Sequence, residues 1–471
     1  MTRSDVGLRS ERGPVLAAVM LGTALIAVDS TVIATAVPAV VADIGGFTQF
    51  PWLFSIYLLA QAVSVPIYGK LSDLYGRKPV ILFGIGLFLV ASILCGAAWS
   101  MGALIAFRVL QGLGAGAIAP TTITIVGDLY SVAERAKVQG YLAGVWGVAS
   151  VVGPTLGGLL SEYASWRWIF LVNIPLCLLA AGMIYTKFRE QLEPSKPVID
   201  YRGAALLTVG LTLAVLGLLE GGQAWAWDSP VSIAVLGGGA LLLAVFALVE
   251  RRAAEPVLPL WVFRRRLLLA SGTVSACAGA VLLGLSSYVP TFVQESLGLN
   301  ALIAGFALAA LLLGWPISAS QAGRIYLRIG FRGCALIGVS FVLVGAASLL
   351  LLDAHSSVLQ VAASCFVIGL GMGSTVSPTL IAAQSSVGWH ERGVVTANNM
   401  FLRSIGSSVG VAVFGAIANA TLGSSGSTPG SHVDPALLAT AVHGVFVAIA
   451  VVAAVAVVAV LLLPRHQGKP A

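Results

Sequence analysis

Long runs of apolar residues, separated by short polar stretches, occupy the chain from end to end. A helix that spans a membrane needs about 20 consecutive apolar residues, and the pattern predicts fourteen such helices. They are expected at residues 14–38, 50–70, 79–98, 101–126, 138–161, 167–187, 203–221, 230–250, 267–293, 301–323, 332–352, 357–383, 394–420 and 438–463. The pattern therefore predicts an all-α integral membrane protein with 14 transmembrane helices.

The composition excludes the other broad classes of protein. Of the 471 residues, 58% are hydrophobic and only 10% are charged. A soluble protein of this length could not hide so much apolar surface, and disordered chains are polar and charged. The five cysteines lie inside apolar runs without metal-ligand spacing, so we expect small buried hydrophobes and neither a metal nor a cofactor.

The basic residues predict how the helices are oriented in the membrane. If the N-terminus is cytoplasmic, every Lys and Arg except Arg108, Arg167 and Arg403 falls on or beside the cytoplasmic side, as the positive-inside rule requires. An even number of spans then places both termini in the cytoplasm. The same rule explains the net charge of +7, so no nucleic-acid partner is expected.

The predicted helices fall into three blocks. Residues 14–190 form an N-terminal six-helix bundle, 203–250 a two-helix linker pair, and 267–464 a C-terminal six-helix bundle, with a mobile external loop expected at Gly423 to Pro435. Two glycine-rich patterns recur at nearly the same separation along the chain, Gly69 to Lys78 at Gly323 to Arg332, and Gly112 to Gly116 at Gly369 to Gly373. Two blocks related by a pseudo-two-fold axis along the membrane normal are a transporter architecture.

Asp29 lies in the middle of the first predicted helix, near the bilayer midplane, and has no basic neighbour in the sequence. An unpaired carboxylate there should accept a proton and exchange it when water enters a cavity. A proton-coupled carrier requires such a group. The alternative is an acid that only bonds to Ser or Thr for packing.

Arg108 lies inside the predicted helix 101–126, with Gln111 one turn further on nearly the same face. A buried arginine costs roughly 2.5–3.5 kcal/mol on insertion scales, so it needs a partner or a water-filled cavity. The glycines that follow permit close helix contact. These residues form either a functional polar centre or a structural bridge.

The segment from Gly69 to Lys78 joins two predicted helices on the cytoplasmic side. Gly76 permits a tight turn, and Asp73 can face a helix N-terminus or an arginine such as Arg77 through a modest, reversible contact. Such a contact suits a gate that holds one conformation by a few kcal/mol. A merely basic inner loop would not explain Asp73 between two glycines.

The segment Gly153-Pro154-Thr155-Leu156-Gly157-Gly158 predicts a bent, closely packed helix. Pro154 lacks an amide donor and should kink the helix, while Gly153 and Gly157 offer a small face to another helix. Glu220, at the outer end of the helix 203–221, is expected to be a solvated end residue. One expectation is a substrate pocket lined by Tyr57, Gln61, Gln111, Trp146, Asn398 and Arg403. The alternative is lipid- or core-facing packing for the aromatic residues, and a tie between helices for Asn398 and Arg403.

Together these motifs resemble the major facilitator superfamily. Gly69 to Lys78 resembles its loop motif G-x-L-a-D-r-x-G-r-k, Arg108 to Gly116 its motif R-x-x-Q-G-x-G, and Gly153 to Gly158 its antiporter motif G-P-x-x-G-G. Asp29 to Pro38 and Trp166 to Pro175 resemble segments of the fourteen-span drug:proton antiporter branch, as does the extra helix pair.

The resemblance implies two pseudo-symmetric bundles that rock about a central cavity. It implies that Asp29 carries the proton, that Arg108 modulates its proton affinity, and that Asp73, Arg77 and Asp128 form an inner gate. The second copy of the loop motif has Leu327 in place of the aspartate, so a gating role is not carried over to it.

The expected function is therefore a proton-coupled exporter of amphipathic or cationic drug-like compounds, in a bacterial inner membrane, as a multi-pass monomer surrounded by lipid. It is not expected to be an enzyme, and ATP-driven transport is disfavoured because the chain has no phosphate-binding G-x-x-x-x-G-K-[ST] loop. A cationic substrate would make Glu220 a candidate second proton carrier. The alternatives are a dedicated exporter of an endogenous metabolite or lipid, and a non-transporting membrane sensor or scaffold.

Overall fold

The computed structural model describes residues 7–45, 52–190, 200–221, 225–253, 256–299, 301–353, 355–422 and 435–464. The expected mobile loop after Gly423 lies outside these residues. Within them, thirteen helices are long and apolar enough to cross a membrane, and one of these, α11, contains two of the predicted spans. The prediction of fourteen membrane-spanning segments in an all-helical chain is confirmed.

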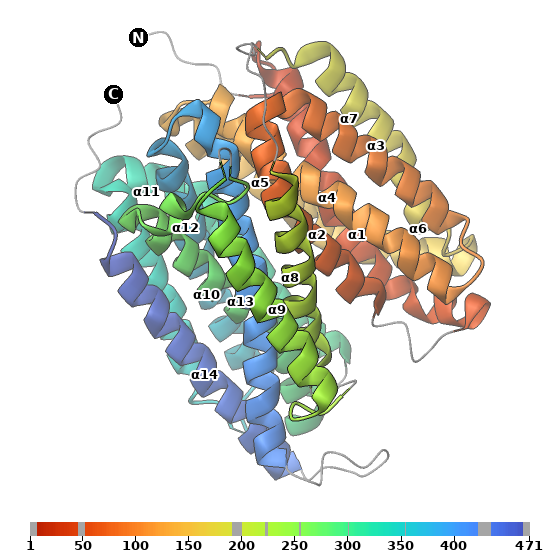
Figure 1. Ribbon diagram of the computed structural model, residues 1–471. Coiled ribbons are helices and arrows are strands. Elements are labelled where there is room, and N and C mark those ends of the chain that lie inside the picture. Colours follow the sequence, from red (N-terminus) through yellow and green to blue (C-terminus); the bar gives the residue numbers. More distant parts are fainter. Residues whose placement is uncertain are drawn as a thin grey trace. The chain divides into compact units, whose positions relative to one another are not determined.

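The helices follow the predicted order (Figure 1). Their bounds are α1 Gly13–Ile44, α2 Trp52–Tyr75, α3 Arg77–Gly96, α4 Met101–Leu129, α5 Val132–Tyr163, α6 Trp168–Leu171, α7 Asn173–Lys187, α8 Tyr201–Glu220, α9 Pro230–Glu250, α10 Arg266–Thr291, α11 Ala301–Leu349, α12 Val358–Ser385, α13 Arg392–Leu422 and α14 Pro435–Leu461, with short helical turns at Leu260–Phe263, Phe292–Ser296 and Trp389–Glu391.

Most helix ends differ from the sequence prediction by a few residues, and α1, for example, extends to Ile44 rather than 38. The helix expected at 167–187 is interrupted at Val172, which separates α6 from α7. The helices expected at 301–323 and 332–352 form one continuous α11 that turns at Gly330. Helix α5 begins at Val132 rather than 138, because Ser131 and Glu134 form a reciprocal cap on its first turn.

The two glycine-rich patterns that recur along the chain have similar backbone structure in both copies. Gly76 and Gly330 occupy the same position in the repeated loop motif, and both have a left-handed φ, 93° and 81°, with ψ of 162° and 166°. This conformation favours glycine because a side chain would be strained there. In the same way, a Cβ on Gly84 would lie 3.1 Å from the carbonyl oxygen of Gly114, and one on Gly338 would lie 2.8 Å from that of Gly371. The repeat inferred from sequence is therefore present in the backbone.

The chain divides into two compact units, which are described separately. The first comprises residues 1–212, 239–260 and 384–401, and the second residues 213–238, 261–383 and 402–471. In the first unit α3 and α4 lie side by side (Figure 1), with Phe88 of α3 completely buried in the core. In the second, α10, α11, α12 and α14 surround a core in which the rings of Phe292 and Phe446 meet edge to face.

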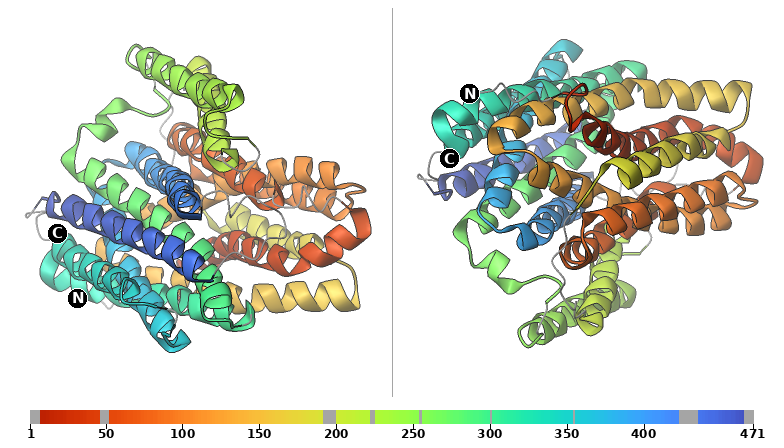
Figure 2. Two further views of the ribbon diagram at one scale, coloured as in Figure 1. Left: turned by 90° about the horizontal axis from the view of Figure 1, so that it is seen from below. Right: turned by 90° about the horizontal axis from the view of Figure 1, so that it is seen from above.

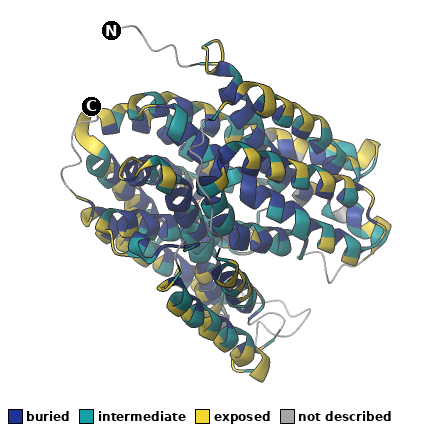
Figure 3. Ribbon diagram, turned by 45° about the horizontal axis from the view of Figure 1, so that its top comes forward, coloured by how far each residue is buried: buried dark blue, intermediate teal, exposed yellow. Residues whose placement is uncertain are grey.

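The helix faces that do not pack on other helices are also apolar. Along α3, Ile81, Ile85 and Phe88 are buried, whereas Phe83 and Val90 are more than half exposed; buried and exposed positions alternate in the same way along other helices (Figure 3). Exposed side chains of this kind suit contact with lipid.

Helices α8 and α9, yellow-green in Figure 2, pair with each other. A Cβ on Gly210 of α8 would lie 3.1 Å from the side chain of Leu243 on α9. The pair was expected from the two apolar runs between residues 203 and 250.

Candidate functional site

A buried polar centre joins α1 to α4 in the first unit. Nη1 of Arg108 donates a hydrogen bond to Oδ2 of Asp29 at 2.7 Å, and Nε2 of Gln111 donates to Oδ1 of the same carboxylate at 2.8 Å. Arg108 also donates to Oε1 of Gln111 at 2.7 Å and to the carbonyl of Leu53 at 3.1 Å. Each of the three side chains is at most 3% exposed. The carboxylate therefore has a charged and a neutral donor, both held by one turn of α4.

This geometry corrects one expectation from the sequence. Asp29 is not an unpaired carboxylate, because Arg108, which lies 79 residues further along the chain, forms an ion pair with it. The arginine accordingly has the partner that burial demands. The local sequence did not reveal the pair, since neither residue has an opposite charge nearby on its own helix, whereas the family resemblance did imply that Arg108 acts on Asp29.

Three further residues complete the polar centre, and the sequence analysis did not assign them to it together. Ser92 of α3 accepts from Gln111 at 3.1 Å, and Nδ2 of Asn173, the first residue of α7, lies 3.4 Å from both Asp29 Oδ1 and Ser92 Oγ. The guanidinium of Arg108 stacks 4.2 Å from the ring centre of Tyr57. The hydroxyl of Tyr57 and Oδ1 of Asn173 are buried without a hydrogen-bond partner among the described residues, so the centre retains polar atoms that its own ion pair does not satisfy.

In the second half of the chain, apolar residues occupy the positions that match Arg108 and Gln111. By the sequence echo between Gly112–Gly116 and Gly369–Gly373, the positions of Arg108 and Gln111 correspond to Cys365 and Ile368. Both are completely buried in the apolar core of the second unit. The matching helices thus pack there with apolar residues at these two positions, so packing alone does not require the ion pair.

A second charged cluster surrounds Arg77, whose side chain is completely buried. Its guanidinium lies 2.8 Å from Asp73 and 3.0 Å from Asp128, and it donates to the backbone carbonyl of Trp389 at 2.6 Å. It also stacks 3.8 Å above the indole ring of Trp389. The expected group of Asp73, Arg77 and Asp128 is therefore brought together, and Trp389 is a partner that the sequence did not indicate.

Asp73 caps the beginning of α13. Its carboxylate accepts hydrogen bonds from the backbone amides of Gly393 at 2.9 Å and Val394 at 2.8 Å, which is favourable because a helix N-terminus attracts negative charge. Arg392 adds a contact of 3.0 Å to Asp128. Gly69 allows this approach, since a Cβ there would lie 2.9 Å from the carbonyl oxygen of Gly393. The loop motif and α13 are thus held together by non-covalent contacts, which can break and re-form.

Glu190 holds the other end of the same motif. Its two carboxylate oxygens accept from the backbone amides of Arg77 and Lys78 at 2.9 and 3.1 Å, which are the first residues of α3. Nothing in the local sequence pairs residue 190 with this helix, so the sequence analysis missed it.

The glycines of the antiporter motif pack α5 on α1. A Cβ on Gly153 would lie 2.7 Å from Cβ of Thr31, and one on Gly157 would clash with the backbone of Val32. The hydroxyl of Thr31 also donates to the carbonyl of Ala149 at 3.1 Å. Gly158 faces open space, and the side chain of Pro154 lies outside the described residues. The expected small-residue contact therefore exists, and it lies two residues from Asp29 on α1.

The residues expected to line a substrate pocket are only partly brought together. Tyr57 and Gln111 both contact Arg108, and Gln61 is half-buried on α2. Trp146 is 46% exposed, which is contrary to a place in an enclosed pocket.

Three other predicted polar residues belong to α8 and α13. Asn398 is buried on α13 in the first unit, while Arg403, on the same helix, belongs to the second. Glu220 is the last residue of α8, also in the second unit.

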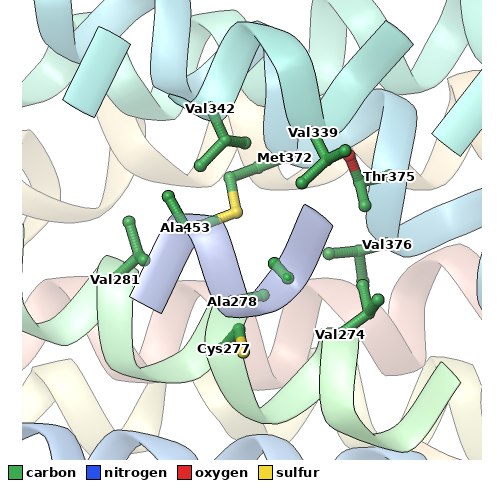
Figure 4. Close-up of a pocket in the computed structure, with 11 residues that line it drawn as sticks. Val274, Cys277, Ala278, Val281, Val339, Val342, Met372, Thr375, Val376 and Ala453 are labelled. Carbon is green, nitrogen blue, oxygen red and sulfur yellow. The ribbon is translucent and has the colours of Figure 1, made fainter. Parts of the chain in front are cut away.

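A small cavity lies among α10, α11, α12 and α14 of the second unit (Figure 4). Its volume is about 10 Å³, and its walls include Val281, Val342 and Met372. A cavity needs about 10–15 Å³ to hold one water molecule, so this one is a packing gap rather than a substrate site. None of the residues predicted for the substrate pocket lines it.

The family pattern described as Major Facilitator Superfamily matches residues 19–411. The chain belongs to the major facilitator superfamily. Multidrug resistance protein 3 of Bacillus subtilis (strain 168) is 35% identical over 403 residues, which cover 86% of this chain and 79% of that protein. The multidrug transporter protein MdtP of the same organism is 33% identical over 423 residues, covering 90% and 78%.

The fold of this superfamily member also matches a solved transporter. The human organic anion transporter MFSD10 (TETRAN) superposes with a TM-score of 0.65 at 16% identity, over 96% of this chain and 99% of that one. At that identity the likeness concerns the fold alone. The chain is thus a multi-pass membrane protein of a transporter family, and its relatives are multidrug transporters rather than enzymes.

Proposed function

We propose that this chain is a proton-coupled exporter of amphipathic or cationic drug-like compounds, and that it acts by alternating access as a monomer in a bacterial inner membrane. Residues 14–190 and 267–464 would be the two bundles that move, and 203–250 the inserted helix pair. The multidrug names of the two Bacillus relatives support the class of substrate.

The buried pair of Asp29 and Arg108 is the observation that carries the proposal. A buried ion pair loses the hydration of two charges, and apolar residues of similar volume often stabilise a protein as well or better. The second half of the chain does have apolar residues, Cys365 and Ile368, at the positions that match Arg108 and Gln111. A charge pair whose matching positions in the other half are apolar is therefore better explained by function than by packing.

Proton binding at Asp29 provides the coupling in this proposal. A proton on Asp29 removes one charge of the pair and releases Arg108 from its ionic partner. Thr31 lies two residues along α1 and packs on Gly153 of α5. A change in the position of Asp29 on protonation would therefore alter the contact between α1 and α5. On the outer side Asp29 takes up a proton and the drug leaves; on the inner side the proton leaves and the drug binds.

The driving force is sufficient for useful export. One proton that crosses a potential of 100 mV releases about 2.3 kcal/mol, which corresponds to roughly a 50-fold gradient of drug. A one-for-one exchange with a monovalent cationic drug moves no net charge and uses only the pH gradient. Coupling to a second proton would restore the electrical term, and Glu220 is then the carboxylate proposed to carry it.

The cluster around Arg77 is the proposed inner gate. Asp73 holds the amides of Gly393 and Val394, and Arg77 holds Trp389 and Asp128. All of these are hydrogen bonds or ion pairs that water can replace, so the gate can open at a cost of a few kcal/mol.

The test is dye efflux from proteoliposomes with an imposed pH gradient, with wild type beside Asp29→Asn. Asp43→Asn is the matched control, because Asp43 lies on the same helix but its side chain is 48% exposed. We expect gradient-driven efflux of several unrelated cations, abolished in Asp29→Asn with dye binding retained, and preserved in Asp43→Asn.

Undiminished gradient-driven efflux by Asp29→Asn would contradict the proton assignment. Failure of wild type to move any of the dyes would instead favour a narrow endogenous metabolite or lipid as the substrate.

A further inference from the structure

Two carboxylates converge where α8 begins and α9 ends, far along the chain from Asp29. Asp200 precedes α8, and its Oδ1 accepts from the backbone amide of Gly203 at 2.8 Å. Glu250 is the last residue of α9, and its Oε1 accepts from the backbone amide of Leu258 at 2.5 Å. Each carboxylate thus has one oxygen bound to the backbone.

The remaining oxygen of each carboxylate has no such partner. Oδ2 of Asp200 and Oε2 of Glu250 are both buried without a hydrogen bond among the described residues, and Glu250 as a whole is 4% exposed. A Cβ on Gly203 would lie 2.8 Å from Oε2 of Glu250 and would clash with Oδ2 of Asp200. The two free oxygens therefore point to the same spot beside the Cα atom of Gly203.

Two ionised carboxylates at this spot would repel each other with little water to screen them, which favours a bound proton or cation. The charged groups that act on Glu250 are Asp200 and Lys70 of α2. Lys70 is one positive charge against two carboxylates, so a bound proton or cation between the free oxygens would reduce the remaining negative charge.

The number of available oxygen ligands indicates whether a metal cation or a proton is bound here. Calcium takes six to eight oxygen ligands and magnesium six in near-ideal octahedral geometry. Among the described residues at this spot, two carboxylate oxygens lack a hydrogen bond. No group of three or more His, Cys, Asp or Glu side chains that could hold a metal ion occurs in the described part of the chain. A proton needs only two oxygens, one that carries it and one that accepts its hydrogen bond.

We propose that Asp200 and Glu250 bind a single proton between them, as a proton site separate from Asp29. The proton is attached to one carboxylate oxygen and hydrogen-bonded to the other. Its release leaves two negative charges beside Lys70, which adjoins Gly69 on α2 and belongs to the helix that also carries Asp73. The protonation state of the pair thus sets how strongly α2 is attracted to α8 and α9. The site is independent of the transport activity proposed above.

The experiment uses infrared spectroscopy of the full-length protein in lipid nanodiscs at neutral pH, with Asp29→Asn as the background so that Asp29 contributes no signal. Glu250→Gln, Asp200→Asn and the double variant are compared with Glu162→Gln, which removes an exposed carboxylate of α5. We expect either single substitution to remove the band of one protonated carboxyl group. The double variant should lose no more than either single variant, and Glu162→Gln should lose nothing.

Three results would overturn the proposal. The first is an unchanged protonated-carboxyl band in both Glu250→Gln and Asp200→Asn. The second is a double variant that loses twice the intensity, which would mean two separate protonated groups. The third is stoichiometric binding of magnesium or calcium that disappears in Glu250→Gln, which would make the site a metal site. If Glu250→Gln fails to fold, Asp200→Asn gives the same test, because a lone Glu250 has no second carboxylate with which to share a proton.

Discussion

Arg108 and Asp29 form an ion pair at 2.7 Å in which the side chains are only 1% and 2% exposed. Removal of one partner leaves the other as an uncompensated buried charge, whereas removal of both does not. We therefore expect Arg108→Met to lower the free energy of unfolding by about 3–5 kcal/mol, and the double variant Asp29→Asn/Arg108→Met to recover most of that loss.

Denaturant unfolding in detergent measures this cycle. Arg264→Met is the control, since Arg264 is exposed and its replacement should change stability little. A double variant as unstable as the sum of its two single variants would show that the pair is not energetically coupled.

Arg77 and Lys78 are adjacent basic residues. We expect conservative substitution to reduce efflux at Arg77 but not at Lys78. Arg77 contacts Asp128 through Nε and both Asp73 and Trp389 through Nη2, and it stacks on an indole. A lysine ammonium cannot reproduce this set of contacts. The ammonium of Lys78 donates to the backbone carbonyl of Tyr185 at 2.7 Å near the surface and lies over the Tyr185 ring. Arg77→Lys should therefore reduce efflux about as much as Arg77→Ala, and Lys78→Arg should leave it near the wild-type rate.

Efflux rates in proteoliposomes, normalised to the amount of inserted protein, decide between these outcomes. Wild-type efflux by Arg77→Lys would mean that the gate needs only a positive charge at this position.

Gly153 and Gly158 of α5 allow alanine substitution to be compared at a crowded and at an open position of the same helix. An added methyl group at Gly153 would meet Thr31, whereas one at Gly158 would meet nothing within 4 Å. Overpacking of this kind costs about 1–3 kcal/mol, while alanine in place of an unhindered helical glycine gains up to about 1 kcal/mol. Gly153→Ala should lower the melting temperature in detergent, and Gly158→Ala should leave it unchanged or raise it.

A smaller residue at position 31 should partly restore Gly153→Ala. Equal melting temperatures for Gly153→Ala and Gly158→Ala would contradict the close contact between α1 and α5.

The predicted orientation can be tested by labelling single cysteines. The five native cysteines are all buried, so a membrane-impermeant maleimide should leave the wild-type protein unlabelled. Arg9→Cys, in the segment predicted to be cytoplasmic, should react only in inside-out vesicles. His355→Cys, in the exposed loop between α11 and α12, should react from outside the cell. Labelling of both from the same side would overturn the predicted topology.

The sequence predicted the helices well because bilayer thickness imposes one strong requirement, a run of about 20 apolar residues. It also predicted the motif residues that cluster around Arg77 and Asp29. It did not predict which face of a helix is buried, because the exposed Phe83 and Val90 of α3 are as apolar as the buried Phe88. A soluble helix would reveal its inner face by contrast with a polar outer one.

This lack of contrast explains why Ser92 and Asn173 were not assigned to the polar centre. Each is a polar residue in a largely apolar helix. Only the packing of the helices brings Ser92 within 3.1 Å of Gln111 and Asn173 within 3.4 Å of Asp29. Trp389 and Glu190 were missed for a different reason. They lie in segments outside the long helices, where position depends on contacts with residues more than a hundred places away.

The cap that Asp73 forms on α13 also orders events during synthesis of the chain. Asp73 and Gly393 are 320 residues apart, so at 5–20 residues per second the ribosome needs roughly 16–64 seconds to supply the second partner after the first. Asp29 and Arg108 are only 79 residues apart, so Arg108 is added to the chain roughly 4–16 seconds after Asp29. A nascent chain can therefore complete its buried ion pair early, whereas the contacts around Asp73 must wait until thirteen of the fourteen spans have begun to emerge.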